Sequence, residues 1–287
     1  MKKDLRYYTE KFEYHSLYLQ QAINSIGLSY HGKNVDLVQE VYLSLLNRIG
    51  INIASIYHLS EFFLEENVSS SIALLFRACI SDIILGYYLI EFKNDLQSFE
   101  GEIRIKDVEF LKYMLEVGPK EQKILSHKTG ITSINFVEHI VDNFEDCIKT
   151  KTVKENGKID FKSNSDIRKE CRGNSILKKD DQNFQLTEKN IFDKLKNRNI
   201  EMEDHFDNIY IHWKYYSQFQ HFSHLGKGLL DDKKENFLYY LMGSLIEVYN
   251  FLSVMQIIVF NFPVDDFDQA KNDLIQVYRE FKPDQLE

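Results

Sequence analysis

Arg77 and Asp82 interrupt the most apolar stretch of the chain, residues 72–90, and a buried charge requires a partner. The two residues are five positions apart, about 140° around a helix, so they do not face each other. Ser81, four positions after Arg77, shares its face of the helix. Arg77 must therefore find a carboxylate from another segment, or a ligand. Arg77 is therefore either half of a buried ion pair that fixes the register of two helices or an arginine that faces a ligand.

A second polar group lies in the aromatic segment 210–224. On a helix one stripe of this segment carries Trp213, Ser217, His221 and His224. Ser217 could hydrogen-bond His221 and set its tautomer, as in a working imidazole site. His221 and His224 supply only two ligands for a metal ion, and the sequence indicates no third, so we expect no metal. The histidines are either structural, or they form a site in which His221 acts as an acid/base group or contacts phosphate.

Two short motifs resemble a bacterial all-helical family of unknown function. Its members combine an arginine in an apolar helix, here within residues 73–80, with a distant Ser-x-x-x-His-x-Ser run, here within residues 216–223. The resemblance covers about residues 37–262. The family usually has an acid four residues after the arginine, whereas this chain has Ser81 there and Asp82 one step later. The resemblance implies a helical fold and a site position rather than an activity.

The chain is also distantly similar to the HEPN superfamily, helical bundles that include metal-independent ribonucleases of toxin and phage-defence systems. Their signature is an arginine followed after four to six residues by a histidine, and Arg198 and His205 match it. The spacer carries three acidic residues, which would repel an RNA phosphate. Two Arg/His sets are therefore candidates: Arg77 with Ser217, His221 and His224, and Arg198 with His205.

Three functions follow from these candidates. The first is a HEPN-like, metal-independent endoribonuclease or nucleic-acid-linked effector, with a histidine as acid/base and an arginine stabilising the phosphorane. In it we expect Asp82, Trp213 and Tyr216 to contact substrate. The second is a non-enzymatic interaction or regulatory subunit with a structural polar core, and the third a nucleotide or small-molecule sensor. The expected partners are RNA or a nucleotide, a second copy of the chain, or a protein of a defence or toxin–antitoxin system, without a cofactor.

The elements that position these residues are predicted to be helices. The chain has 287 residues, 44% of them apolar, with three prolines and 12 glycines, a composition that disfavours disordered and turn-rich β classes. We predict one all-α domain over 1–287, a multi-helix up-and-down bundle with a polar, Lys-rich insertion at 149–186. Asn34 is the expected N-cap of the second helix. Helices are expected at about 4–25, 34–66, 69–93, 105–117, 119–127, 133–148, 187 onward, 204–225, 231–262 and 265–281.

Compartment and surface charge follow from composition. The three cysteines show no CxxC spacing, which disfavours a disulfide framework or a thiolate zinc site. The N-terminus lacks the apolar stretch of a signal peptide, and polar or charged residues interrupt the apolar segments 72–90 and 245–262. We therefore expect a cytoplasmic protein that does not cross a membrane. A net charge of −9 disfavours attraction of nucleic acid over the whole surface.

Overall fold

The computed structural model describes residues 4–65, 68–129, 136–150, 159–173, 182–198, 203–220, 234–260 and 266–283. Within these ranges the regular structure is helical, apart from one isolated bridge between Ile148 and Phe161. This confirms the prediction of an all-α, multi-helix bundle. The chain forms two compact units, which we call unit 1 (residues 1–90 and 191–287) and unit 2 (residues 91–190).

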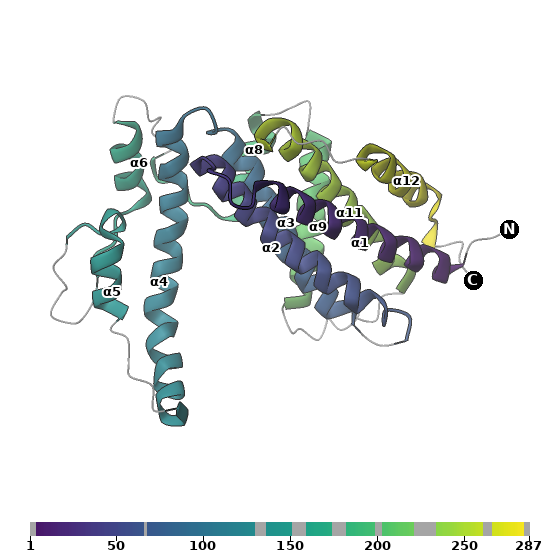
Figure 1. Cartoon of the computed structure of the whole chain (residues 1–287), viewed down its shortest axis with the longest axis horizontal. Helices are drawn as coiled ribbons and strands as arrows, with labels where there is room; N and C mark the ends of the chain where they lie inside the picture. The colour runs from purple at the N-terminus through teal and green to yellow at the C-terminus, as the bar shows by residue number, and fades with distance from the viewer. Residues whose placement is uncertain are drawn as a thin grey trace. The chain divides into compact units, whose positions relative to one another are not determined.

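Unit 1 contains most of the buried apolar residues, and Figure 1 shows the helices that carry them. α1 packs on α2, α11 and α12, while α3 packs on α2, α9 and α11. α3 and α11 are therefore the central helices, as expected from apolar residues on nearly every side. The elements of unit 1 are α1 (Leu5–Tyr30), α2 (Leu37–Ser60), α3 (Ser69–Ile90), α8 (Glu188–Arg198, from Ile191 onward), α9 (Glu203–Ser217), η3 (Gln218–Gln220), α11 (Lys234–Met255), η4 (Gln256–Phe260) and α12 (Phe267–Glu280).

Local capping chemistry explains where the helices of unit 1 begin. The Asp4 carboxylate accepts a hydrogen bond from the backbone N–H of Tyr7 and so caps α1. α2 begins after Asp36, which forms a capping box with Gln39. The prediction of Asn34 as this cap was wrong. Asp36 is the cap because the side chain of Gln39, three positions later, accepts a hydrogen bond from the Asp36 backbone N–H.

Two helices of unit 1 have the length and hydropathy of a membrane span. They are Ser69–Ile90, with a mean hydropathy of 1.7, and Lys234–Phe260, with a mean hydropathy of 1.5. The protein buries 67% of the first apolar window and 56% of the second. Core helices of soluble bundles have the same character, because they are covered by neighbouring helices.

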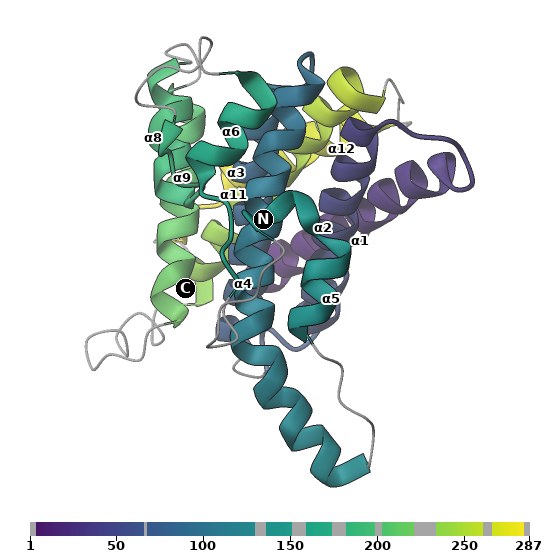
Figure 2. The same cartoon turned by 90° about the vertical axis from the view of Figure 1, so that its left-hand side faces the viewer.

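Unit 2 is built on the long helix α4 (Leu96–Thr129). α5 (Phe136–Asn143), η1 (Glu145–Cys147) and α6 (Asn164–Arg172) all pack against it, and α5 and α6 lie beside it in Figure 2. The predicted break between the helices 105–117 and 119–127 was wrong, since α4 continues through residues 117–119. An interior proline removes one backbone hydrogen bond and crowds the carbonyl four residues earlier, which disfavours a helix, although its fixed φ is itself helical.

An ion-pair network joins α4 to α6 inside unit 2. Glu102 and Arg168 are both fully buried, and the guanidinium donates to both carboxylate oxygens at 2.9 and 2.8 Å. Arg172 pairs with the same carboxylate. The described part of the predicted insertion 149–186 thus contains a capped helix with a buried arginine. The prediction of a single domain over 1–287 remains a prediction.

Candidate functional site

Arg77 on α3 meets two side chains of α9, 136 to 140 positions later in the sequence. Its Nε donates a hydrogen bond to Ser217 Oγ at 3.2 Å, and its guanidinium carbon lies 5.5 Å from the centre of the Trp213 ring. Trp213 Nε1 donates in turn to Ser81 Oγ at 3.1 Å. Two residues of one face of α3, Arg77 and Ser81, therefore hold a single face of α9.

Arg77 is half-buried, and only the Nε of its guanidinium donates a hydrogen bond to a described residue. Within the described ranges no carboxylate forms an ion pair with it, and its two terminal nitrogens have no hydrogen-bond partner. Ser217 and Trp213 fix the inner edge and one face of the group. The terminal nitrogens form a planar fork of donors, which suits a carboxylate or a phosphate.

Aromatic rings continue from this arginine along α9 to α8. Trp213 stacks with Tyr210 at 5.7 Å and an interplanar angle of 16°, and Tyr210 stacks with Phe192 at 4.2 Å and 12°. Lys214 Nζ lies 5.3 Å from the Trp213 ring and 5.7 Å from the Tyr210 ring. We call Arg77, Ser81, Trp213 and Ser217, together with Tyr210 and Lys214, the Arg77 site. It combines two cations with stacked aromatic faces.

Asp82 points away from Arg77, as the spacing predicts, and takes a different partner. Its Oδ1 lies 3.1 Å from Arg48 Nη2 on α2, while its Oδ2 has no hydrogen-bond partner among the described residues. Burial raises the pKa of Asp82 to about 6, although the Arg48 charge lowers it. Asp82 therefore pairs α3 with α2 and does not join the Arg77 site.

Tyr216 lies on the core side of α9. It is fully buried, its hydroxyl is 2.8 Å from Ser244 Oγ on α11, and its ring stacks on Phe76. Burial raises the pKa of Tyr216 well above its usual value. Its contacts therefore hold α9 against α3 and α11, and they lie apart from those of Trp213 and Ser217.

A second polar group surrounds His205, which is the one residue of this group that the sequence predicts as a site residue. His205 Nδ1 lies 3.3 Å from Glu247 Oε2 on α11, and Nε2 lies 3.3 Å from the hydroxyl of Tyr87 on α3. Asn250 also donates to Glu247 at 3.3 Å. Burial raises the pKa of Glu247 to about 7 and lowers that of His205. The signal for Glu247 was a lone acid within an apolar helix.

Several predicted site residues lie outside the described part. His221 and His224 follow η3 and are not described, and of Arg198 only the backbone at the end of α8 is. The expected helix over 204–225 was wrong in extent, since α9 ends at Ser217 and a 3₁₀ turn follows. Ser217 Oγ donates to the carbonyl of Trp213 at 2.7 Å, and such a bond competes with the helical one at this carbonyl.

Among the described residues no group of three or more His, Cys, Asp or Glu side chains is placed to hold a metal ion. Comparison with protein-family models, with curated proteins and with solved structures finds no significant match. The geometry of the side chains is therefore the basis for assigning a function.

Proposed function

We propose that this chain binds single-stranded RNA at the Arg77 site and cleaves it without a metal ion. The observation that carries the proposal is the half-buried Arg77 guanidinium, which Ser217 and Trp213 hold in place and no described carboxylate neutralises. A preorganised guanidinium with two open donor groups suits a phosphate oxygen pair, and its charge opposes the charge that develops during phosphoryl transfer.

The stacked rings support RNA rather than a small anion as the ligand. Trp213 and Tyr210 lie beside two cations, Arg77 and Lys214. Proteins that bind single strands combine cations for the backbone with aromatic faces for the bases. The acidic chain, with a net charge of −9, would then bind RNA through this local site. A second copy of the chain could extend the basic surface.

The proposed reaction is transfer within the RNA backbone. A base removes the proton of a ribose 2′-hydroxyl, the 2′-oxygen attacks the adjacent phosphorus, and the 5′-oxygen leaves with a proton from an acid. The products are a 2′,3′-cyclic phosphate and a free 5′-hydroxyl. In this proposal His221, four positions after Ser217, exchanges the protons, and Arg77 stabilises the phosphorane. Such a nuclease fits a bacterial toxin or phage-defence effector in the cytoplasm.

His205 is the weaker candidate for the catalytic histidine. Both of its ring nitrogens have buried partners, Glu247 and Tyr87. An acid/base group must reach the atom whose proton it transfers, whereas His205 is held between α3 and α11. These contacts favour a structural role for His205, which is what the alternative function, a non-enzymatic regulatory subunit, would require of its polar core.

The single tryptophan of the chain makes the proposal directly testable. Because Trp213 adjoins Arg77, binding of a single-stranded RNA oligonucleotide should change the intrinsic fluorescence. Cleavage of a labelled oligonucleotide in EDTA should give the cyclic phosphate product. We expect Arg77→Met to weaken binding and cleavage by about tenfold or more, since hydrogen bonds to charged groups contribute about 1.5–3 kcal/mol. Arg279→Met, at an exposed position of α12, is the matched control.

The histidine variants separate the possible outcomes. We expect His221→Ala to abolish cleavage while it leaves the fluorescence response to RNA, and His205→Ala to lower stability without abolishing cleavage. Cleavage by Arg77→Met at the parent rate would overturn the proposal. If the parent chain and all its variants bind RNA or a mononucleotide but none cleaves RNA, the result would instead favour the sensor function, which the stacked rings also suit.

A further inference from the structure

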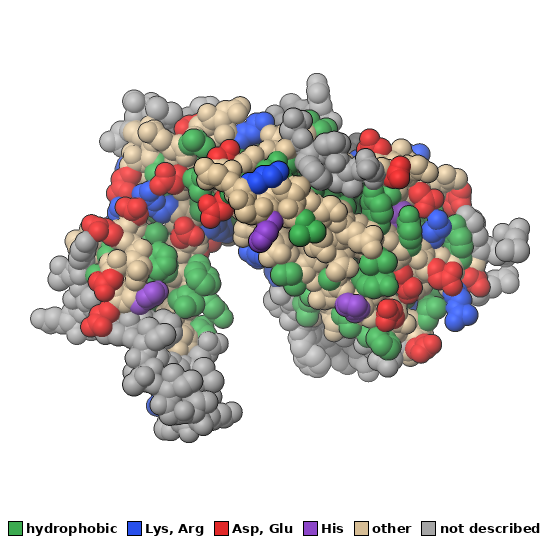
Figure 3. Space-filling view, in the orientation of Figure 1, with side chains coloured by type: hydrophobic (Ala, Val, Ile, Leu, Met, Phe, Trp, Pro, Cys, Tyr) green, Lys and Arg blue, Asp and Glu red, His purple; other side chains and the backbone are tan. Residues whose placement is uncertain are grey.

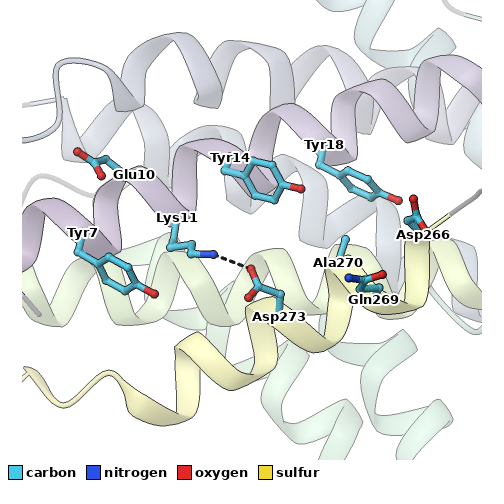
Figure 4. A pocket seen from close by; sticks show the side chains of 9 residues that line it. All are labelled: Tyr7, Glu10, Lys11, Tyr14, Tyr18, Asp266, Gln269, Ala270 and Asp273. Carbon is cyan, nitrogen blue, oxygen red and sulfur yellow. Dashed lines mark hydrogen bonds and ion pairs between the residues drawn. The ribbon is translucent and has the colours of Figure 1, made fainter.

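A cavity of about 600 Å³ opens between α1 and α12 in unit 1. Its α1 wall carries Tyr7, Tyr14 and Tyr18 at helical spacing, and its α12 wall includes Asp266 and Asp273 (Figure 4). The volume lies within the range of small-molecule sites. The cavity is separate from the Arg77 site, since α1 and α12 contribute no residue to that site.

The charges at the middle of the cavity cancel. Lys11 Nζ donates to Asp273 Oδ2 at 2.9 Å, and the same oxygen lies 3.2 Å from His15 Nε2. His15 is fully buried, and its Nδ1 lies 3.1 Å from the Tyr249 hydroxyl. Burial lowers the pKa of His15 to about 4, so the imidazole is neutral at pH 7. Lys11 and Asp273 therefore neutralise each other next to the buried His15.

Two further carboxylates of the lining form no ion pair within the described part of the chain. Glu10 and Asp266 are exposed, and neither forms an ion pair with another described residue. Glu10 lies toward the Tyr7 end and Asp266 beside Tyr18, at the other end (Figure 4). The cavity thus carries a net negative charge at both ends. Acidic side chains are also numerous on the surface where α1 and α12 lie (Figure 3).

The tyrosine rings between these carboxylates are suited to positive charge. Lys11 Nζ already lies 5.9 Å from the centre of the Tyr14 ring, within the range of a cation–π contact. Tyr18 stacks on Tyr249 at 6.1 Å and also contacts Phe267, so its ring is held in place. Ring faces attract alkylammonium groups, and carboxylates at either end add ionic attraction.

From this arrangement we infer that the α1–α12 cavity binds an extended organic polycation, a linear polyamine. From Glu10 to Tyr18, the neighbour of Asp266, α1 rises by about 12 Å at roughly 1.5 Å per residue. A single small cation cannot reach both carboxylates across this length, whereas a flexible polyamine can place one ammonium at each. Its methylene chain would then lie along Tyr14.

The test is calorimetric titration of the whole chain with spermidine, without RNA and at low ionic strength. We expect saturable binding to one site. Glu10→Gln combined with Asp266→Asn should weaken it at least tenfold, and Tyr14→Leu should weaken it severalfold. Asp266 has a left-handed φ of 56°, which asparagine tolerates, so the fold should persist. Asp268→Asn, at an exposed position of the same helix outside the cavity, is the matched control.

Three results would overturn the inference. One is the absence of saturable spermidine binding by the parent chain. Another is an equal loss of affinity in Asp268→Asn, which would mean a diffuse attraction of charges. The third is equal competition by Mg²⁺ at the same ionic strength or by a lysine-containing peptide, which would assign the cavity to a compact cation or to a protein ligand instead.

Discussion

The imidazole Nδ1 of His205 on α9 lies 3.3 Å from carboxylate Oε2 of Glu247 on α11. Burial acts on the two groups in opposite directions, since it raises the pKa of Glu247 to about 7 and lowers that of His205. Both changes favour the uncharged forms. Near neutral pH the contact therefore joins a carboxylic acid close to its midpoint with a neutral imidazole, inside the helical core.

This contact predicts a dependence of stability on pH. Below about pH 4.5 Glu247 is protonated in the folded and the unfolded chain alike. As the pH rises from 4.5 to about 7, the unfolded chain releases its proton first, so the free energy of unfolding falls. Relative to Glu247→Gln, the parent should lose roughly 2–3 kcal/mol between pH 5 and 8. Urea denaturation at each pH measures this difference.

Two further variants isolate the effect. His205 acts in the opposite sense, because its lowered pKa makes the folded state lose stability as the pH falls below 6.5. His205→Gln should therefore remove the part of the stability loss in acid that His205 causes. Glu40→Gln, at an exposed position of α2, should leave the dependence of the free energy of unfolding on pH unchanged. If the free energies of unfolding of the parent and of Glu247→Gln change with pH in parallel, Glu247 is solvated in the folded protein.

Arg48 and Asp82 should be coupled energetically. Arg48→Met leaves the buried Asp82 carboxylate without its cation, and this should destabilise the chain by about 1–2 kcal/mol at pH 8, a modest value because the Arg48 side chain is 63% exposed. Added Asp82→Asn should recover most of the loss in a double-mutant cycle. The loss should shrink at pH 5, where the carboxyl, with a pKa of about 6, is mostly protonated. An equal loss at both pH values would assign the effect to packing.

Gly86 on α3 should be intolerant of a side chain. A Cβ at this position would lie 2.4 Å from Cζ of Phe251 on α11, and the Tyr42 hydroxyl donates to the Gly86 carbonyl at 2.7 Å. Gly86→Ala should therefore destabilise the chain by about 1–3 kcal/mol through overpacking. Urea denaturation measures this.

Gly27 on α1 provides the matched control, because a Cβ there meets nothing within 4 Å. Gly27→Ala should stabilise the chain by about 0.5–1 kcal/mol, since alanine loses less backbone entropy in a helix. Equal effects of the two substitutions would contradict the close contact of α3 with α11.

In unit 2, Glu102→Gln should loosen the packing of α6 on α4. The substitution removes the carboxylate charge that pairs with the fully buried Arg168, at a cost of about 3–5 kcal/mol. Hydrogen exchange should therefore accelerate in residues 91–190. Glu100→Gln breaks only a surface pair with Arg104 on the same helix and should cost about 0.3–0.5 kcal/mol. If hydrogen exchange accelerates equally in the two variants, the pairing of Glu102 with α6 does not hold this helix on α4.

The sequence was sufficient to predict the helical class and to predict that Arg77 and Asp82 lie on different sides of α3. Scarce proline and glycine, together with apolar periodicity, predict helices because these are properties of neighbouring residues. The 140° between Arg77 and Asp82 follows from helical geometry alone, and the structure shows the two residues with separate partners. By contrast, the predicted ends at Asn34 and Pro119 were wrong, because helix ends depend on small differences between competing caps and on neighbouring packing.

Which partners meet was decided only by tertiary structure. The sequence indicated that Arg77 and Asp82 each need a partner, but Ser217 lies 140 positions away on α9 and Arg48 lies on α2. The contact of His205 with Glu247 and the cavity between α1 and α12 likewise join segments that are far apart in the chain. Helical periodicity fixes which side of a helix a residue occupies. Which other helix covers that side depends on how all the apolar faces pack together, and no local pattern contains that information.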